Sequence, residues 1–71
     1  MNEFGNELKR LREKSNATTK DVGRAVGIPQ SRYSELEKGI RVPTDGQVER
    51  LEKYYGVSAG DLGALLQKQA S

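Results

Sequence analysis

The sequence predicts an all-α domain, a five-helix orthogonal bundle in which short helices are joined by short loops. Apolar side chains recur at intervals of three and four residues, the spacing of one helical face, and no segment alternates like a strand. Residues that typically begin and end helices separate these stretches. The 71 residues are predicted to form one domain over 1–71, with a core over about 4–66 and a tail that frays from Gln67.

The first two helices are predicted over 4–14 and 18–26. The apolar residues of the first follow the i, i+4, i+7 spacing of one buried face: Phe4, Leu8 and Leu11. Thr18 is a suitable N-cap for the second helix, and Asp21 gives it a pattern similar to a capping box. Gly27 follows this helix, and its tolerance of a positive φ suits a helix end.

The third helix is predicted over 29–38, with Pro29 in its first turn, where the missing N–H is not needed. Gly39 ends this helix, and a loop over 40–43 follows. Ile28 precedes the helix and is predicted to fill the core. The buried stripe is predicted to consist of apolar residues at helical spacing: Tyr33, Leu36 and Ile40.

The fourth helix is predicted to begin at Thr44 or Asp45 and to end at Gly56. Its inward face would consist of Val48, Leu51 and Tyr55. The fifth helix is predicted to begin at Ser58, because Asp61 repeats the cap pattern three residues later. Its apolar face would consist of Leu62, Leu65 and Leu66.

The composition argues against several classes of site and of protein. The chain has no cysteine and no histidine, so it lacks thiolate ligands, the commonest zinc ligand and the usual general base. We therefore expect no metal, no cofactor and no enzymatic activity. No apolar run approaches the roughly 20 residues that span a bilayer, and the charged N-terminus lacks the apolar core of a signal peptide. These features predict a cytoplasmic protein.

The charge is distributed unevenly along the chain. Residues 1–41 carry nine basic and six acidic side chains, whereas residues 42–71 carry three and four. A mild positive bias in the first part is typical of a surface that meets an anionic partner, and equally of an ordinary solvated surface with mixed charge.

The segment over 18–39 has the spacing of a helix-turn-helix. Two helices that cross steeply need a small residue at the crossing, and Gly23 provides it although mid-helix glycine costs about 1 kcal/mol relative to alanine. Gly27 follows four residues later, in the turn, and Tyr33 another six residues on. Apolar residues of both helices would pack beneath the crossing: Val22, Val26, Ile28, Tyr33 and Leu36.

Several blocks at matching spacing resemble the phage repressor and Cro family of helix-turn-helix DNA-binding domains, also called the xenobiotic-response-element family. These blocks are LKRLRE (8–13), the segment 18–39 ending in LEKG, RVPT (41–44) and YGVSAGDL (55–62). The resemblance covers residues 4–66 and implies a lambda-repressor-like fold with its helix-turn-helix at about 18–38. Tyr33 stands where the family usually has Ile or Val. Asp45 and Glu52 stand where it favours Leu and Ala, so the packing of the fourth helix departs from the family pattern.

Opposite its buried stripe, the third helix has polar side chains that suit base reading: Gln30, Ser31, Arg32, Ser34 and Glu35. In this fold the N-terminal part of this helix enters the major groove. There Gln can bind adenine, Arg can bind guanine, and Glu can accept a hydrogen bond from cytosine. The resemblance assigns base reading to Gln30, Ser31 and Glu35. The alternative is that these residues form an ordinary solvated helix face. For Arg32, a further alternative is a contact to the DNA backbone only.

Phosphate contacts are expected from four residues: Thr19, Lys20, Lys38 and Arg41. Thr19 occupies a place where the family usually has a phosphate-binding Gln, although a plain capping role suits it equally. The resemblance also implies a structural ion pair between Arg12 and Glu37. A homodimer contact is expected through the last two helices, from Tyr54, Leu62, Leu65 and Leu66; the alternative is that the leucines only close the core.

These features predict a sequence-specific double-stranded DNA-binding transcriptional regulator. The expected mode of action is that of a bacterial or phage repressor, which binds a two-fold operator as a homodimer and associates with the nucleoid when bound. The alternative is a protein-interaction module with the same fold, such as an antitoxin or a coactivator. No membrane partner or small-molecule ligand is expected.

Overall fold

The computed structural model describes residues 3–70, with side chains as far as Leu66. Residues 3–70 form five α-helices and no strand, which confirms the predicted fold class. The helices are α1 (Glu3–Lys14), α2 (Thr19–Val26), α3 (Gln30–Lys38), α4 (Asp45–Tyr55) and α5 (Asp61–Ala70). Helix α5 extends beyond Gln67, where fraying was expected, and the side chains of residues 67–70 lie outside the described part.

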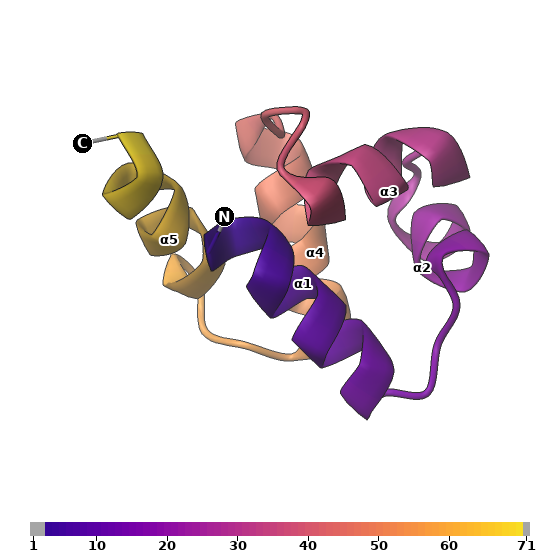
Figure 1. Cartoon of the computed structure of the whole chain (residues 1–71). Helices are drawn as coiled ribbons and strands as arrows, with labels where there is room; N and C mark the ends of the chain where they lie inside the picture. Colours follow the sequence, from indigo (N-terminus) through magenta and orange to yellow (C-terminus); the bar gives the residue numbers. More distant parts are fainter. Residues whose placement is uncertain (1–2, 71) are drawn as a thin grey trace.

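Helix α1 crosses the middle of the bundle and contacts both α3 and α5 (Figure 1). Helix α2 packs on α3 and α4, and α4 packs on α5. The first and last helices lie side by side, because α1 and α5 contact each other directly. All five helices and the α2–α3 turn contribute to one apolar core, which is formed by Phe4, Leu8, Leu11, Val22, Val26, Ile28, Tyr33, Leu36, Val48, Leu51 and Leu62. The arrangement leaves α2 and α3 together at one side of the molecule.

The predicted caps of α2 and α4 are present. Thr18 Oγ1 accepts a hydrogen bond from the Asp21 N–H at 3.1 Å, and the Asp21 carboxylate accepts one from the Thr18 N–H at 3.2 Å. The hydrogen bond from the Thr18 N–H to this carboxylate lowers the pKa of Asp21. Thr44, rather than Asp45, is the N-cap of α4 and forms the same reciprocal pair with Gln47. Helix starts that depend on local hydrogen bonds were therefore predictable.

Ile40 does not extend the buried stripe of α3, as the sequence had suggested. Its side chain is 71% exposed. Gly39 adopts a left-handed conformation with φ of 78° and ends the helix, so the chain turns before residue 40 reaches the inner face. Helical spacing stops predicting burial once the backbone leaves the helix.

The predicted start of α5 at Ser58 is also wrong, because α5 begins at Asp61. Gly60 has a φ of 92°, a conformation that a helix cannot pass through. The first turn of α5 is bound from another helix instead. The Glu52 carboxylate accepts hydrogen bonds from the backbone N–H groups of Leu62 at 2.9 Å and Gly63 at 3.4 Å. Glu52 is only 5% exposed, so α4 supplies a buried cap to α5.

Tyr33 and Tyr55 form a polar contact at the edge of the core. Tyr33 is fully buried, and its hydroxyl lies 2.7 Å from that of Tyr55. The family usually has Ile or Val at position 33, and these side chains have no polar group to satisfy. The Tyr33 hydroxyl does need a hydrogen-bond partner, and Tyr55 provides it. Burial raises the pKa of Tyr55 to about 12, and it raises the pKa of Tyr33 even further above its ordinary value.

We expect Glu52→Ala to lower the free energy of unfolding by about 1–3 kcal/mol, because two N–H groups at the buried start of α5 lose their acceptor. Glu52→Gln keeps an acceptor oxygen and should lose less. Urea denaturation followed by circular dichroism measures both changes. Equal stability of Glu52→Ala and the wild type would show that the carboxylate is dispensable.

Alkaline pH should unfold the protein in part through Tyr33 and Tyr55. A tyrosine with a raised pKa in the folded state contributes stability that is complete below pH 10 and is lost as the pH rises through about 12. The free energy of unfolding, measured from pH 8 to pH 12, should therefore fall less steeply in Tyr55→Phe than in the wild type. Tyr54→Phe, which alters a ring that is 40% exposed, should keep the wild-type slope.

Candidate nucleic-acid interface

The crossing of α2 and α3 is fixed by two glycines. A Cβ atom at Gly23 would lie 2.6 Å from the carbonyl oxygen of Ile28, closer than real Cβ contacts. Gly27 adopts a left-handed conformation with φ of 72° and ends α2, and its N–H donates to the Gly23 carbonyl. Helix α4 also binds this end, because Arg50 Nε donates to the Val26 carbonyl at 2.8 Å. The start of α3 therefore has a defined position.

Helix α3 separates its buried and polar residues as the sequence predicted. Tyr33 and Leu36 are inside the core. Of the five candidate base-reading residues, Gln30, Ser31 and Arg32 are exposed, whereas Ser34 and Glu35 are half-buried. The N-terminal half of α3 thus presents a polar surface, while its two buried side chains fix which face points outward.

The structure connects candidate base-reading residues to candidate phosphate-binding residues. Gln30 Nε2 donates to Thr19 Oγ1 at 3.1 Å, which links the start of α3 to the start of α2. Arg41 Nε lies 2.7 Å from Glu35 Oε1 and forms an ion pair with it. Thr19 and Arg41 therefore lie directly beside candidate base-reading residues.

The Arg12–Glu37 ion pair joins α1 to α3. Arg12 Nε and Nη2 bind the two carboxylate oxygens of Glu37 at 2.7 and 3.1 Å, and Arg12 Nη1 donates to the Ala17 carbonyl at 3.2 Å. The side chains are 17% and 8% exposed. The hydrogen bond to Glu37 raises the pKa of Arg12 above its ordinary value. The pair has the geometry of a structural clamp, with its polar groups satisfied.

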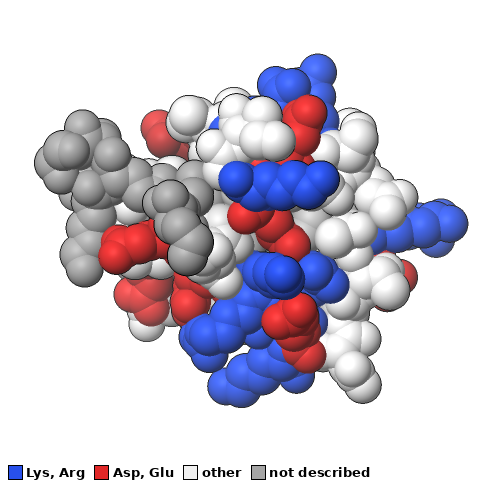
Figure 2. Space-filling model, viewed as in Figure 1, with Lys and Arg blue, Asp and Glu red and all other residues white. Residues whose placement is uncertain are grey.

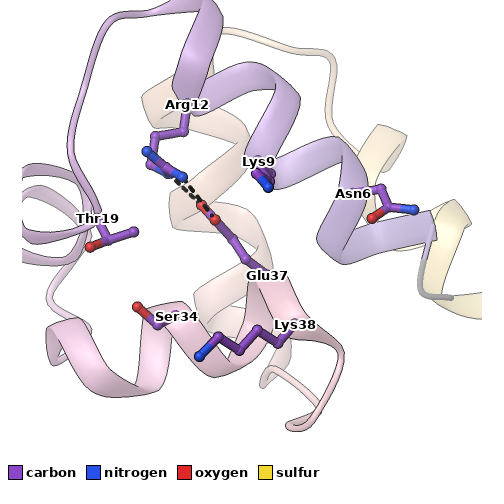
Figure 3. A pocket seen from close by; sticks show the side chains of 7 residues that line it. All are labelled: Asn6, Lys9, Arg12, Thr19, Ser34, Glu37 and Lys38. Atoms are coloured by element: carbon purple, nitrogen blue, oxygen red, sulfur yellow. Dashed lines mark hydrogen bonds and ion pairs between the residues drawn. The ribbon is translucent and has the colours of Figure 1, made fainter.

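A polar groove of about 550 Å³ lies over this ion pair, between α1, α2 and α3 (Figure 3). Its walls are formed by Asn6, Lys9, Arg12, Thr19, Ser34, Glu37 and Lys38. Glu37 is bound by Arg12, and within the described side chains neither Lys9 nor Lys38 has an ion-pair partner. The ammonium groups of Lys9 and Lys38 are therefore available to bind an anion in the groove.

Sequence reasoning missed Asn6 and Lys9 as parts of this surface. The signal for Lys9 was its place three residues before Arg12, which puts both on one side of α1. Lys20 is exposed but does not line the groove. Figure 2 shows basic side chains gathered over the end of α1 and spread over α3, with acidic side chains between them.

Three of the four candidate dimer residues remain accessible. Leu62 is 1% exposed and belongs to the core of the single chain, so it cannot contact a partner. Leu65 and Leu66 are half-buried, and Tyr54 is 40% exposed with its ring packed edge-on against Tyr55. These three residues lie on α4 and α5, away from the polar surface of α3.

The described residues hold no group of His, Cys, Asp or Glu side chains arranged to bind a metal ion. None of the helices described is long and apolar enough to cross a membrane.

Comparisons with known proteins agree with this geometry. Residues 3–66 match the family described as Helix-turn-helix domain. The chain is 30% identical over 59 residues to RstR, the cryptic phage CTXphi transcriptional repressor of Vibrio cholerae. That alignment covers 83% of this chain and 53% of RstR, so the chain spans about half the length of this curated relative. No solved structure matches.

The family match extends from α1 into α5 and includes both helices of the crossing. It confirms the resemblance inferred from the sequence blocks, and the helix-turn-helix is a DNA-binding motif. The chain belongs to the helix-turn-helix domain family.

Proposed function

We propose that this protein is a sequence-specific, double-stranded DNA-binding transcriptional regulator, and that it represses by binding a two-fold operator as a homodimer. The observation that carries the proposal is the polar N-terminal half of α3, whose orientation is fixed by buried Tyr33 and Leu36. The similarity to RstR, a transcriptional repressor, supports repression rather than activation.

The major groove, about 12 Å wide, admits an α-helix such as α3. With α3 in that groove, Gln30, Ser31 and Glu35 face base edges. Gln30 can bind adenine through its amide while Thr19 restrains its side chain. Arg32 and Ser34 flank these residues and contact bases or the adjacent backbone.

The DNA backbone would pass beside α2 and the groove between α1 and α3. Thr19, Lys20, Lys38 and Arg41 are the proposed phosphate contacts, and the groove adds Lys9 to them. Each phosphate that a cation neutralises releases counterions, so the affinity should fall as salt rises.

A two-fold operator requires two copies of α3 in successive major grooves, about 34 Å apart. We propose that Tyr54, Leu65 and Leu66 provide the contact between copies, since their apolar surface is only partly covered within one chain. Such a regulator would act in the cytoplasm and associate with the nucleoid when bound.

Selection of bound sequences from random DNA tests this proposal. We expect a palindromic site, and we expect Gln30→Ala to weaken binding to it by about 1–3 kcal/mol while leaving non-specific binding nearly unchanged. Lys38→Ala should instead reduce the slope of log affinity against log salt by about 1. Lys53→Ala, on α4 outside this surface, is the matched control.

This function would be contradicted if Gln30→Ala selected the same DNA sequence as the wild type and if the affinity for DNA did not change with salt concentration. Capture of a protein partner without any preference among DNA sequences would support the protein-interaction module instead.

The dimer contact predicts that Leu66→Glu weakens self-association at least tenfold, because a carboxylate would be placed in an apolar contact. Sedimentation equilibrium measures the dissociation constant, and circular dichroism verifies the fold. Leu66→Met keeps the volume and should associate like the wild type. Equal association of Leu66→Glu and Leu66→Met would place the contact elsewhere.

A further inference from the structure

Glu35 is an unusual residue for a helix that approaches DNA. A carboxylate inside the major groove lies between two rows of phosphates, which repel it and lower the affinity. Glu35 is nevertheless on the outer side of α3, half-buried, about one turn before the helix ends. Either the Glu35 carboxylate lowers the affinity for DNA, or another group of the protein neutralises its charge.

Arg41 is held beside Glu35 by the backbone that follows α3. Gly39 turns the chain with a left-handed φ of 78°, and the Ile40 N–H then donates to the Glu35 carbonyl at 3.0 Å. Residue 41 follows directly, and its Nε reaches Glu35 Oε1 at 2.7 Å. The helix end therefore aims the guanidinium at this carboxylate.

The ion pair is too exposed to serve mainly as a structural clamp. The side chains of Arg41 and Glu35 are 45% and 36% exposed, against 17% and 8% for Arg12 and Glu37. Surface pairs of this kind contribute little to folding stability. The consequence of the pair is instead to restrict the rotation of Glu35 on the outer face.

The contact leaves hydrogen-bonding capacity on both partners. A single N–H of Arg41 binds one oxygen of Glu35, and the described part of the chain forms no other hydrogen bond to either side chain. Glu35 Oε2 remains an acceptor for cytosine N4, and the Nη groups of Arg41 remain donors for a phosphate.

We propose that Arg41 is a positioning residue that neutralises Glu35 and orients it to read cytosine. This inference rests on the proposed function and adds a role for Arg41 beyond a phosphate contact. Glu35 then contributes base discrimination without the full repulsion of an isolated carboxylate. Specificity at its base pair depends on a residue that does not touch the base.

The test is a double-mutant cycle of Arg41→Gln, Glu35→Gln and the double variant, with sequence selection from random DNA and affinity measured on the selected site. Arg41→Gln should reduce the preference for cytosine at the Glu35 position about tenfold, while the preference that depends on Gln30 stays. In the Glu35→Gln background, Arg41→Gln should leave base preference unchanged.

Lys38→Gln is the matched control, because it removes one positive charge at the end of α3 and Lys38 has no ion pair with Glu35. It should weaken binding equally for all sequences. Arg41→Lys keeps the charge and should restore part of the cytosine preference. Thermal melting followed by circular dichroism verifies that each variant is folded.

The inference is wrong if Arg41→Gln weakens binding to all sequences by one factor, and by the same factor in the Glu35→Gln background. Arg41 would then bind only phosphate, while Gln30-dependent reading and the proposed function stand. It is also wrong if Glu35→Gln leaves the preferred base unchanged. Binding by the wild type without sequence preference would overturn the proposed function as well.

Discussion

The contact between Arg12 and Glu37 is the constraint on which the rest of this small protein depends. It joins the first helix to the last turn of α3 through two hydrogen bonds, with both side chains largely buried. Removing one partner would leave an uncompensated charge, at a cost of up to 3–5 kcal/mol for a fully buried pair. The same pair lies beneath the polar groove, so it also sets the distance between the cations of α1 and those of α3.

Polar contacts between helices supplement a core that a chain of 71 residues can fill only modestly. Glu52 binds the first turn of α5, Tyr33 binds Tyr55, and Arg50 binds the end of α2. Two of these residues, Tyr33 and Glu52, are departures from the pattern that the family favours. Each of the two residues has a buried polar group with a partner on another helix. These polar contacts fix the helices relative to one another, in addition to the burial of apolar side chains.

The proposed DNA-binding surface combines cations with an acid that has an ion-pair partner. Lys9 and Lys38 remain without an ion-pair partner among the described side chains, whereas Glu35 is bound by Arg41. In the proposed complex, attraction to the phosphates and discrimination among bases would thus come from different residues. A net charge of only +2 is compatible with DNA binding, because a polyanion is attracted by the local charge of the surface that it meets and not by the net charge of the whole chain.

The sequence by itself determined the helices, the caps of α2 and α4, and the α2–α3 turn, because these depend on side chains within a few residues of one another. It also indicated Gln30 and its neighbours on α3 as an outward face, since Tyr33 and Leu36 had to be buried. Only the tertiary structure decided the start of α5 and the burial of Leu62. Only the tertiary structure shows that Lys9 lines the groove and that Arg41 forms an ion pair with Glu35. Each of these depends on groups that meet across helices or around a turn, where sequence spacing no longer fixes distance.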